Sequence, residues 1–470
     1  MTRARAPSSA ATSPSGVSLF SAANEATLAV FSSRDGLRYG LLGLPLAFVA
    51  LPLYVILPNH YATAFGVPLT ALGLVLLGAR LFDAFIDPLL GAVSDRLFAR
   101  STRAVLVFGA AASVVLAAGF AGLFFPVVRD PQGLLLWATA MLMVTYAAYS
   151  AVSVAHQSWG AMLGGDEAQR SRIVAWREGL GLLGVVLASI TPVLLGLGAT
   201  TAIFAGALAL GLWAWSRSPQ PRRAPKESSP AAGNHLPTAA TARPVSAVWR
   251  PFHSRAFRRL LVVFMLNGIA SAIPATLVLF FVQDLLQAPR SLEPAFLGSY
   301  FLCAALSIPL WLKVVRRIGL ARTWGIGMAL SVAVFVWAAQ MGAGDAVPFL
   351  VVCALSGVAL GTDLALPSAL LAGVIGNAGD RGRAEGAYFG WWNFATKLNL
   401  ALAAGLALPL LGAFGYAPGA RDAGALEALI IAYCVLPCAL KLAAGGALYT
   451  LVIRPARTVA APSSPSRTPS

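Results

Sequence analysis

Residues 79–88 read Ala-Arg-Leu-Phe-Asp-Ala-Phe-Ile-Asp-Pro, and they place three ionisable side chains in a segment otherwise apolar enough to cross a membrane. Translocon-type insertion scales put roughly 2.5–3.5 kcal/mol on each charge at the centre of a membrane helix. Three such charges facing lipid would cost about 8–10 kcal/mol, enough to oppose insertion of the helix. We therefore expect Arg80, Asp83 and Asp87 to face a polar interior, which makes them candidate functional residues.

The composition of the whole chain is that of a helical membrane protein. Of its 470 residues, 58% are hydrophobic and only 11% are charged, whereas soluble domains carry about 25% charged residues. The apolar residues form blocks of about 20, each long enough to cross a hydrocarbon core. We expect twelve spans, near residues 37–58, 69–90, 104–126, 134–156, 174–196, 198–216, 257–283, 293–313, 322–341, 346–372, 386–415 and 424–452.

The spans fall into two sets of six. The predicted organisation is a disordered cytoplasmic tail (1–30), an N-terminal six-helix bundle (31–216), a cytoplasmic linker (217–256), a C-terminal six-helix bundle (257–454) and a second disordered tail (455–470). If both termini are cytoplasmic, cytoplasmic segments hold 28 Lys and Arg residues and external loops hold three. This bias follows the positive-inside rule, favours a bacterial inner membrane, and explains the net charge of +16 without nucleic-acid binding.

Two six-helix halves joined by a basic loop suggest the major facilitator fold. The loop after the second span reads Gly91-Ala-Val-Ser-Asp95-Arg96-Leu-Phe-Ala-Arg100. It resembles the G-x-x-x-D-R-x-x-x-R loop of that superfamily. The resemblance implies that Gly91, Asp95, Arg96 and Arg100 form a conformational loop between the second and third spans.

The spacing of the acids in the second span suggests cation binding. Asp83 and Asp87 are four residues apart and lie on one helix face, which Arg80 shares. Two carboxylates about 6 Å apart in a low-dielectric interior repel unless a cation lies between them or one is protonated. A site for a coupling Na⁺ or H⁺ would satisfy this condition. The alternative is a purely structural network of Arg80 with the two acids.

Residues 79–91 closely resemble the second-helix signature of the glycoside–pentoside–hexuronide:cation symporters, the melibiose permease family. The resemblance implies that Asp83 and Asp87 bind the coupling cation and that the Ser150 hydroxyl lies near it. It extends over nearly all twelve spans. Other matching stretches are Tyr39-Gly40, Trp176-Arg177-Glu178, Asn267, residues 363–367 and residues 385–397.

Lys397 lies mid-span in the predicted eleventh helix, where an unpaired ammonium is costly. Asn393 shares its face. In this fold the eleventh helix approaches the second, so we expect Lys397 to join the charge network of Asp83 and Asp87. Asp363 is an alternative partner for Lys397.

Three departures from the family pattern limit the identification of the solute and the ion. The first span is apolar at residues 43–47, where the best-studied sugar site of the family has an acid, and Ser153 replaces a second acid. Ile86 stands where an amide ligand to sodium is common. Melibiose itself is therefore a poor candidate, and both H⁺ and Na⁺ remain open.

Polar and aromatic side chains within the spans supply candidate contacts to a solute. Arg177 matches an arginine near the sugar in the family, and Trp391 and Trp392 offer rings that can stack on a pyranose. His156 has an equally good alternative as a core histidine. The full predicted substrate-binding set is Ser153, His156, Gln157, Arg177, Asn267, Trp391, Trp392 and Asn393.

We therefore expect a secondary active symporter for a sugar, glycoside or related small polar solute, working as a monomer in the lipid bilayer. A transporter of an amphiphile, such as a lipid or drug-like solute, is the alternative, and a non-transporting membrane sensor is a remote one. No enzyme motif is apparent, and no cofactor is expected beyond the coupling H⁺ or Na⁺. The four cysteines all lie inside apolar spans and predict neither disulfides nor a metal site.

Overall fold

The computed structural model describes residues 31–221, 247–416 and 419–455, and within these ranges the regular secondary structure is entirely helical. Both predicted tails lie outside the described residues, apart from Pro455. Of the predicted linker, residues 222–246 also lie outside them.

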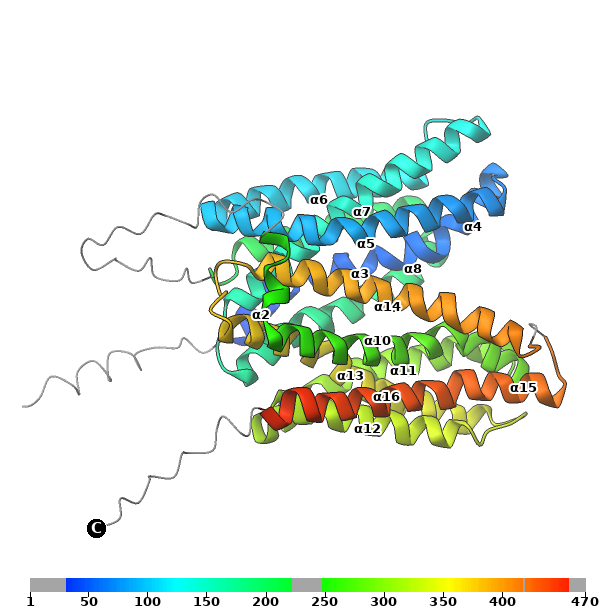
Figure 1. The fold of residues 1–470 in the computed structure, drawn as a ribbon. Coiled ribbons are helices and arrows are strands. Elements are labelled where there is room, and N and C mark those ends of the chain that lie inside the picture. Colours follow the sequence, from blue (N-terminus) through cyan, green and yellow to red (C-terminus); the bar gives the residue numbers. More distant parts are fainter. Residues whose placement is uncertain (1–30, 222–246, 417–418, 456–470) are drawn as a thin grey trace, which may run out of the picture.

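In the N-terminal half, the first predicted span is built from short helices in series, and the last two spans share one long element. The helices are α2 (Ser33–Gly40), α3 (Gly43–Phe48), a π-helix (Pro52–Ile56), α4 (Leu57–Phe65), α5 (Leu69–Arg100), α6 (Thr102–Phe124), α7 (Pro131–Met162) and α8 (Glu167–Ser216). The helices α5, α6 and α7 lie at the top of Figure 1.

The C-terminal half forms the lower bundle in Figure 1. It begins with a 3₁₀-helix (Arg250–His253) and α10 (Arg255–Phe280), which a π-helix (Phe281–Leu285) extends. A 3₁₀-helix (Arg290–Leu292) leads into α11 (Glu293–Ile318), which is followed by α12 (Leu320–Ala338), α13 (Ala346–Asn377) and α14 (Glu385–Ala413). The last span joins α15 (Ala423–Ile430), a π-helix (Ile431–Val435), α16 (Leu436–Ala447) and a π-helix (Leu448–Ile453).

The fold class is confirmed as an all-α membrane protein. Nine helices in the described ranges are long and apolar enough to cross a membrane. The other three predicted spans coincide with α2–α4, with α5 and with α14. Predicted spans five and six both lie in α8, which is interrupted between them at Gly196. The φ of Gly196 is 77°, a positive value that glycine adopts without strain.

Side-chain caps determine where several helices begin. Asp130, Asp166 and Asp422 each accept a hydrogen bond from a backbone N–H in the first turn of α7, α8 and α15. Ser101 and Ser254 do the same for α6 and α10. Each cap satisfies an N–H group that the helix itself cannot pair.

The two halves have their own cores and meet along specific helices. Trp159, Trp215 and Phe120 are fully buried in the N-terminal half, and Trp324 and Phe349 are fully buried in the C-terminal half. Across the halves, α14 packs against α5 and α7, while α8 packs against α11 and α13. The helix α2 and the last turn of the final span lie at the same end of the molecule, on the left of Figure 1, and we call this the terminal end.

Candidate functional site

The predicted acids of α5 meet Lys397 of α14 in one buried cluster. Lys397 Nζ lies 2.6 Å from Asp83 Oδ1 and 2.8 Å from Asp87 Oδ2. Ser150 of α7 donates to Asp83 Oδ1 at 2.9 Å, and Lys397 donates to Ser150 Oγ at 2.9 Å. Three helices from two halves thus supply one polar group of four side chains, which we call the carboxylate–lysine cluster.

Local helix geometry places the two acids together. Asp83 and Asp87 lie one turn apart on α5, on the face that packs against α7 and α14. Pro88 has no N–H and interrupts the helical hydrogen bonds of the same turn. Lys397 Nζ also donates to the Asp83 carbonyl oxygen at 3.1 Å. The ammonium therefore satisfies both backbone and side-chain acceptors of α5.

The charges of the cluster do not balance. Two carboxylates and one ammonium leave an excess of one negative charge when all three are ionised, apart from the charge of the exposed Arg80, which acts on Asp83 from one turn before it. Asp87 is fully buried, and its Oδ1 accepts no hydrogen bond from any described residue. A buried charge is costly unless it is paired, so Asp87 is the less fully compensated of the two acids.

Arg80 and Asn393 flank this cluster. The Arg80 side chain is exposed one turn before Asp83 on α5, and its positive charge acts on the Asp83 carboxylate. Asn393 is partly buried one turn before Lys397 on α14.

In the described ranges, no group of three or more His, Cys, Asp or Glu side chains is arranged to hold a metal ion.

Several predicted solute contacts lie between the halves near the terminal end. Gln157 of α7 and Arg177 of α8 line a small cavity together with Ser368 of α13. Gln157 Nε2 donates to Ser153 Oγ at 3.2 Å, and Gln157 Oε1 has no hydrogen-bond partner among the described residues. Arg177 Nε donates to Glu178 at 2.9 Å. Gln157 and Arg177 thus bring an amide and a guanidinium to a cavity that α13 of the other half also lines.

His156 is a core residue. It is fully buried, its ring packs 4.4 Å from that of Tyr39, and its Nε2 donates to the Tyr39 carbonyl oxygen at 2.8 Å. The ring also lies edge-on to Trp215. The sequence left open whether His156 contacts the solute or packs in the core. In the structure it packs between α2, α7 and α8.

Both tryptophans of α14 are held by protein groups. Trp392 is buried and stacks on Phe264 of α10, with ring centroids 3.8 Å apart. Trp391 Nε1 donates to the Val248 carbonyl oxygen at 2.9 Å, and its ring packs against Trp249 at 4.8 Å. Neither ring is placed as a free platform for a sugar.

Asp363 and Asn267 belong to a second polar cluster, built within the C-terminal half. Lys441 Nζ lies 2.8 Å from Asp363 Oδ2 and 3.0 Å from Asn267 Oδ1. Asp363 also accepts hydrogen bonds from Ser271 and from Trp324 Nε1. The alternative pairing of Asp363 with Lys397 is therefore not observed, because Lys441 occupies Asp363 and Lys397 reaches α5 instead. The sequence did carry one signal for Lys441, since it is a cation inside an apolar span.

The prediction of a loop at residues 91–100 is wrong, because these residues continue the helix α5 to Arg100, and this part of α5 joins the halves at the terminal end. Asp95 accepts hydrogen bonds from the backbone N–H groups of Gly386 (2.6 Å) and Ala387 (2.9 Å), at the start of α14. A Cβ atom on Gly91 would overlap the Gly386 carbonyl oxygen, so only glycine permits this approach. Arg96 and Arg100 are exposed at the end of α5.

A second contact of the same kind was not predicted. Glu167, the first residue of α8, accepts a hydrogen bond from the Leu320 backbone N–H at 2.7 Å, at the start of α12. Carboxylates are stabilised at helix N-termini because unpaired N–H groups and the helix dipole both favour negative charge. The N-terminal half thus offers two carboxylates, Asp95 and Glu167, to the N-termini of two helices of the C-terminal half at the terminal end.

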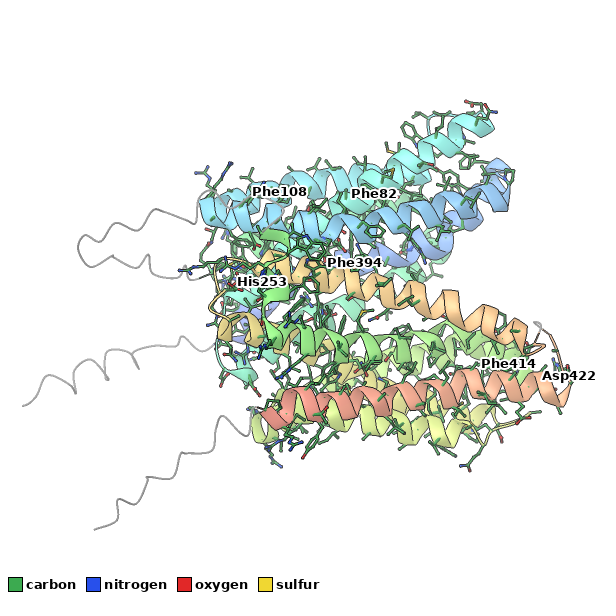
Figure 2. The ribbon with its side chains drawn as sticks, in the orientation of Figure 1. Phe82, Phe108, His253, Phe394, Phe414 and Asp422 are labelled. Atoms are coloured by element: carbon green, nitrogen blue, oxygen red, sulfur yellow. The ribbon has the colours of Figure 1, made fainter. Side chains whose placement is uncertain are left out.

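The phenylalanine rings of Phe85 and Phe394, 5.7 Å apart, continue the contact of α5 with α14. Figure 2 shows Phe394 on α14, at the edge where the two bundles meet. This packing holds Lys397, one turn further along α14, beside the acids of α5.

Comparison with known proteins agrees with this architecture. Residues 38–454 match the family model of the MFS/sugar transport proteins. An uncharacterized symporter of Bacillus subtilis (strain 168), YjmB, is 25% identical over 447 residues, covering 89% of this chain and 93% of that protein.

Solved structures show the same fold at low sequence identity. A bacterial homologue of the iron transporter ferroportin is similar with a TM-score of 0.65 and 15% identity, over 90% of this chain and 100% of that protein. The fucose:proton symporter FucP of E. coli is similar with a TM-score of 0.63 and 15% identity, over 88% and 99%. Since the family model matches most of its length, the chain belongs to the MFS/sugar transport protein family, within the major facilitator superfamily.

Proposed function

We propose that the protein couples the movement of H⁺ or Na⁺ to the symport of a sugar, glycoside or related small polar solute. Family membership supports the class of secondary transporter. The observation that carries the coupling proposal is the pair Asp83 and Asp87, buried and bridged by Lys397. This proposal assigns the protein to the glycoside–pentoside–hexuronide:cation symporters within its broader family.

The charge excess of the carboxylate–lysine cluster explains why a monovalent cation would bind there. Protonation of one acid, or binding of Na⁺ by carboxylate and Ser150 oxygens, brings the cluster to neutrality. Ile86 lies between the acids and supplies no oxygen. The ion and the solute then favour the same arrangement of the halves, which is coupling by linkage.

The solute would bind between the halves, at polar groups of α7 and α8. Gln157 and Arg177 face α13 across a small cavity, and Ser153 lies one turn from Gln157. Hydroxyl-rich solutes match such a mixture of donors and acceptors. In the fold of this superfamily the two halves rock around a site of this kind. The basic segments, and hence both termini, would lie in the cytoplasm of a bacterial cell.

Transport by the purified protein tests the proposal. In proteoliposomes, uptake of radiolabelled methyl β-D-glucoside, D-xylose and D-glucuronate is measured with an inward pH gradient, an inward Na⁺ gradient or no gradient. We expect one of these solutes to accumulate with one of the two gradients, and the accumulation to be lost in Asp87→Asn. Equal uptake with and without both gradients, in both proteins, would refute coupling.

A further inference from the structure

A cavity of about 210 Å³ lies inside the C-terminal half, enclosed by α10, α11, α12, α13 and the last span. Its lining includes Asp363 and Lys441 and no residue of α5, α7 or α14. The cavity is therefore separate from the carboxylate–lysine cluster, and the proposed coupling function does not use it.

The polar end of the cavity is an ion pair that is already balanced. Lys441 Nζ contacts Asp363 Oδ2 and Asn267 Oδ1, which use two of the three N–H groups of the ammonium. Since one carboxylate faces one ammonium, a ligand with a net charge would leave a charge uncompensated in a buried site. A hydroxyl group avoids this cost, because it can accept from the ammonium and donate to the carboxylate.

A second polar group points to a ligand. Ser356 of α13 lines the cavity, is only 8% exposed, and its Oγ has no hydrogen-bond partner among the described residues. Buried hydroxyl groups are normally hydrogen-bonded. A polar atom of a molecule in the cavity would satisfy Ser356.

The walls between these polar groups are aromatic. Phe296 and Tyr300 of α11, Phe335 of α12 and Tyr433 of the last span line the cavity. Such rings pack well on an apolar body, either face to face or edge to face. Ala275 and Leu297 line the cavity and are exposed, which leaves an opening between α10 and α11.

We propose that this cavity is a second ligand site, for an uncharged amphiphile that carries a hydroxyl group on an aromatic or aliphatic body. The hydroxyl lies against Lys441 and Asp363, and the apolar body lies between the aromatic side chains. The site is distinct from the one proposed for the transported solute.

A series of three matched probes tests both the site and its charge preference. The full chain in lipid nanodiscs is titrated with 2-phenylethanol, phenylacetate and 2-phenylethylammonium, and binding is measured by saturation-transfer NMR with empty nanodiscs subtracted. The alcohol is expected to bind at least tenfold more tightly than either charged probe. If a charged probe binds as tightly as the alcohol, the preference for an uncharged ligand is wrong.

Two substitutions that fill the cavity locate the binding. Ser356→Phe should weaken alcohol binding at least tenfold. Cys353 also lines the cavity, and the smaller change Cys353→Leu should weaken alcohol binding at least threefold. Ser189→Phe, at an exposed position of α8, should leave it unchanged. The proposal would be overturned if the protein in nanodiscs bound no more alcohol than empty nanodiscs do. It would also be overturned if both cavity-filling variants folded and still bound the alcohol as tightly as the wild type.

Discussion

Lys397 Nζ lies 2.6 Å from Asp83 Oδ1, although the two residues are 314 positions apart and belong to different halves of the molecule. The ammonium group of a C-terminal-half residue thus partly neutralises two carboxylates of the N-terminal half. A cation bound there, as proposed above, would share the carboxylate oxygens with Lys397. We infer that ion binding and the contact of α14 with α5 are energetically linked.

Replacing Lys397 by glutamine should make stability depend on external cations. Removing one partner of a buried pair costs about 3–5 kcal/mol, because Asp83 and Asp87 then face each other without the ammonium. We expect the Tm in detergent to fall by several degrees at pH 8. It should recover at pH 5, where protonation relieves the repulsion, or in NaCl relative to choline chloride if Na⁺ binds.

Lys313→Gln provides the matched control, since Lys313 is exposed on α11. Its Tm should change little and should not depend on the cation. If Lys397→Gln behaves like Lys313→Gln at both pH values and in both salts, Lys397 does not compensate the two acids.

The approach of α5 to α14 should depend on the absence of a side chain at Gly91. A methyl group there would overlap the Gly386 carbonyl oxygen, so Gly91→Ala must push the helices apart at the terminal end. Gly78→Ala, on the same helix with open space around its Cβ, is the control, and alanine there should stabilise the helix by up to about 1 kcal/mol. Thermal unfolding should show a lower Tm for Gly91→Ala only, and equal values for both variants would contradict this packing.

Asp95 should hold the terminal end closed. Asp95→Ala removes two hydrogen bonds to α14, and a lost cap of this kind costs about 1–2 kcal/mol. A cysteine introduced as Ser368→Cys, in the small cavity between the halves, should then react with a soluble thiol reagent about 5- to 30-fold faster. The reaction rate is measured by mass spectrometry.

Asp130→Ala is the control for this experiment. Asp130 caps α7 through Gly133 and lies entirely within the N-terminal half, so its loss should not alter the labelling of position 368. A rate that is unchanged by Asp95→Ala, or raised equally by Asp130→Ala, would show that Asp95 does not restrain the halves.

The second ion pair should show strong coupling between its members. Lys441→Met and Asp363→Asn each leave a buried partner uncompensated, at a cost of several kcal/mol. The double variant removes both charges and should be less destabilised than the sum of the single variants, by roughly 1–3 kcal/mol. Additive losses, measured by chemical denaturation, would mean that Lys441 and Asp363 do not stabilise each other.

Hydropathy, and residue spacing within a single helix, were sufficient to predict much of this structure from the sequence. The twelve apolar blocks correspond to helices, and the four-residue spacing of Asp83 and Asp87 placed both acids on one face. Hydropathy was less informative at helix ends. The predicted second span stops at residue 90, whereas α5 continues to Arg100, because a helix can extend beyond its apolar part. That extension brings Asp95 to α14.

Contacts between helices were harder to predict, because spacing along a chain identifies a helix face and not the neighbour that it meets. Lys397 was the only cation predicted as a partner for Asp363, whereas the packing of α10 against both α13 and the last span brings Lys441 to it. The partner of the Trp391 side chain was equally hard to predict. It binds the Val248 carbonyl oxygen, in a segment before α10 that no periodic pattern marks.

Solute exchange and solute accumulation by Asp87→Asn, measured side by side, test whether Asp87 couples the cation to transport. An asparagine mimics a protonated acid, so the variant should still exchange solute across a proteoliposome membrane but should not accumulate it against a concentration gradient. Both rates are measured with the labelled solute that the wild type accumulates, with and without the cation gradient. We predict wild-type-like exchange together with loss of gradient-driven accumulation. Accumulation that remains at the wild-type level and responds to the same gradient would contradict the assignment of Asp87 to the coupling site.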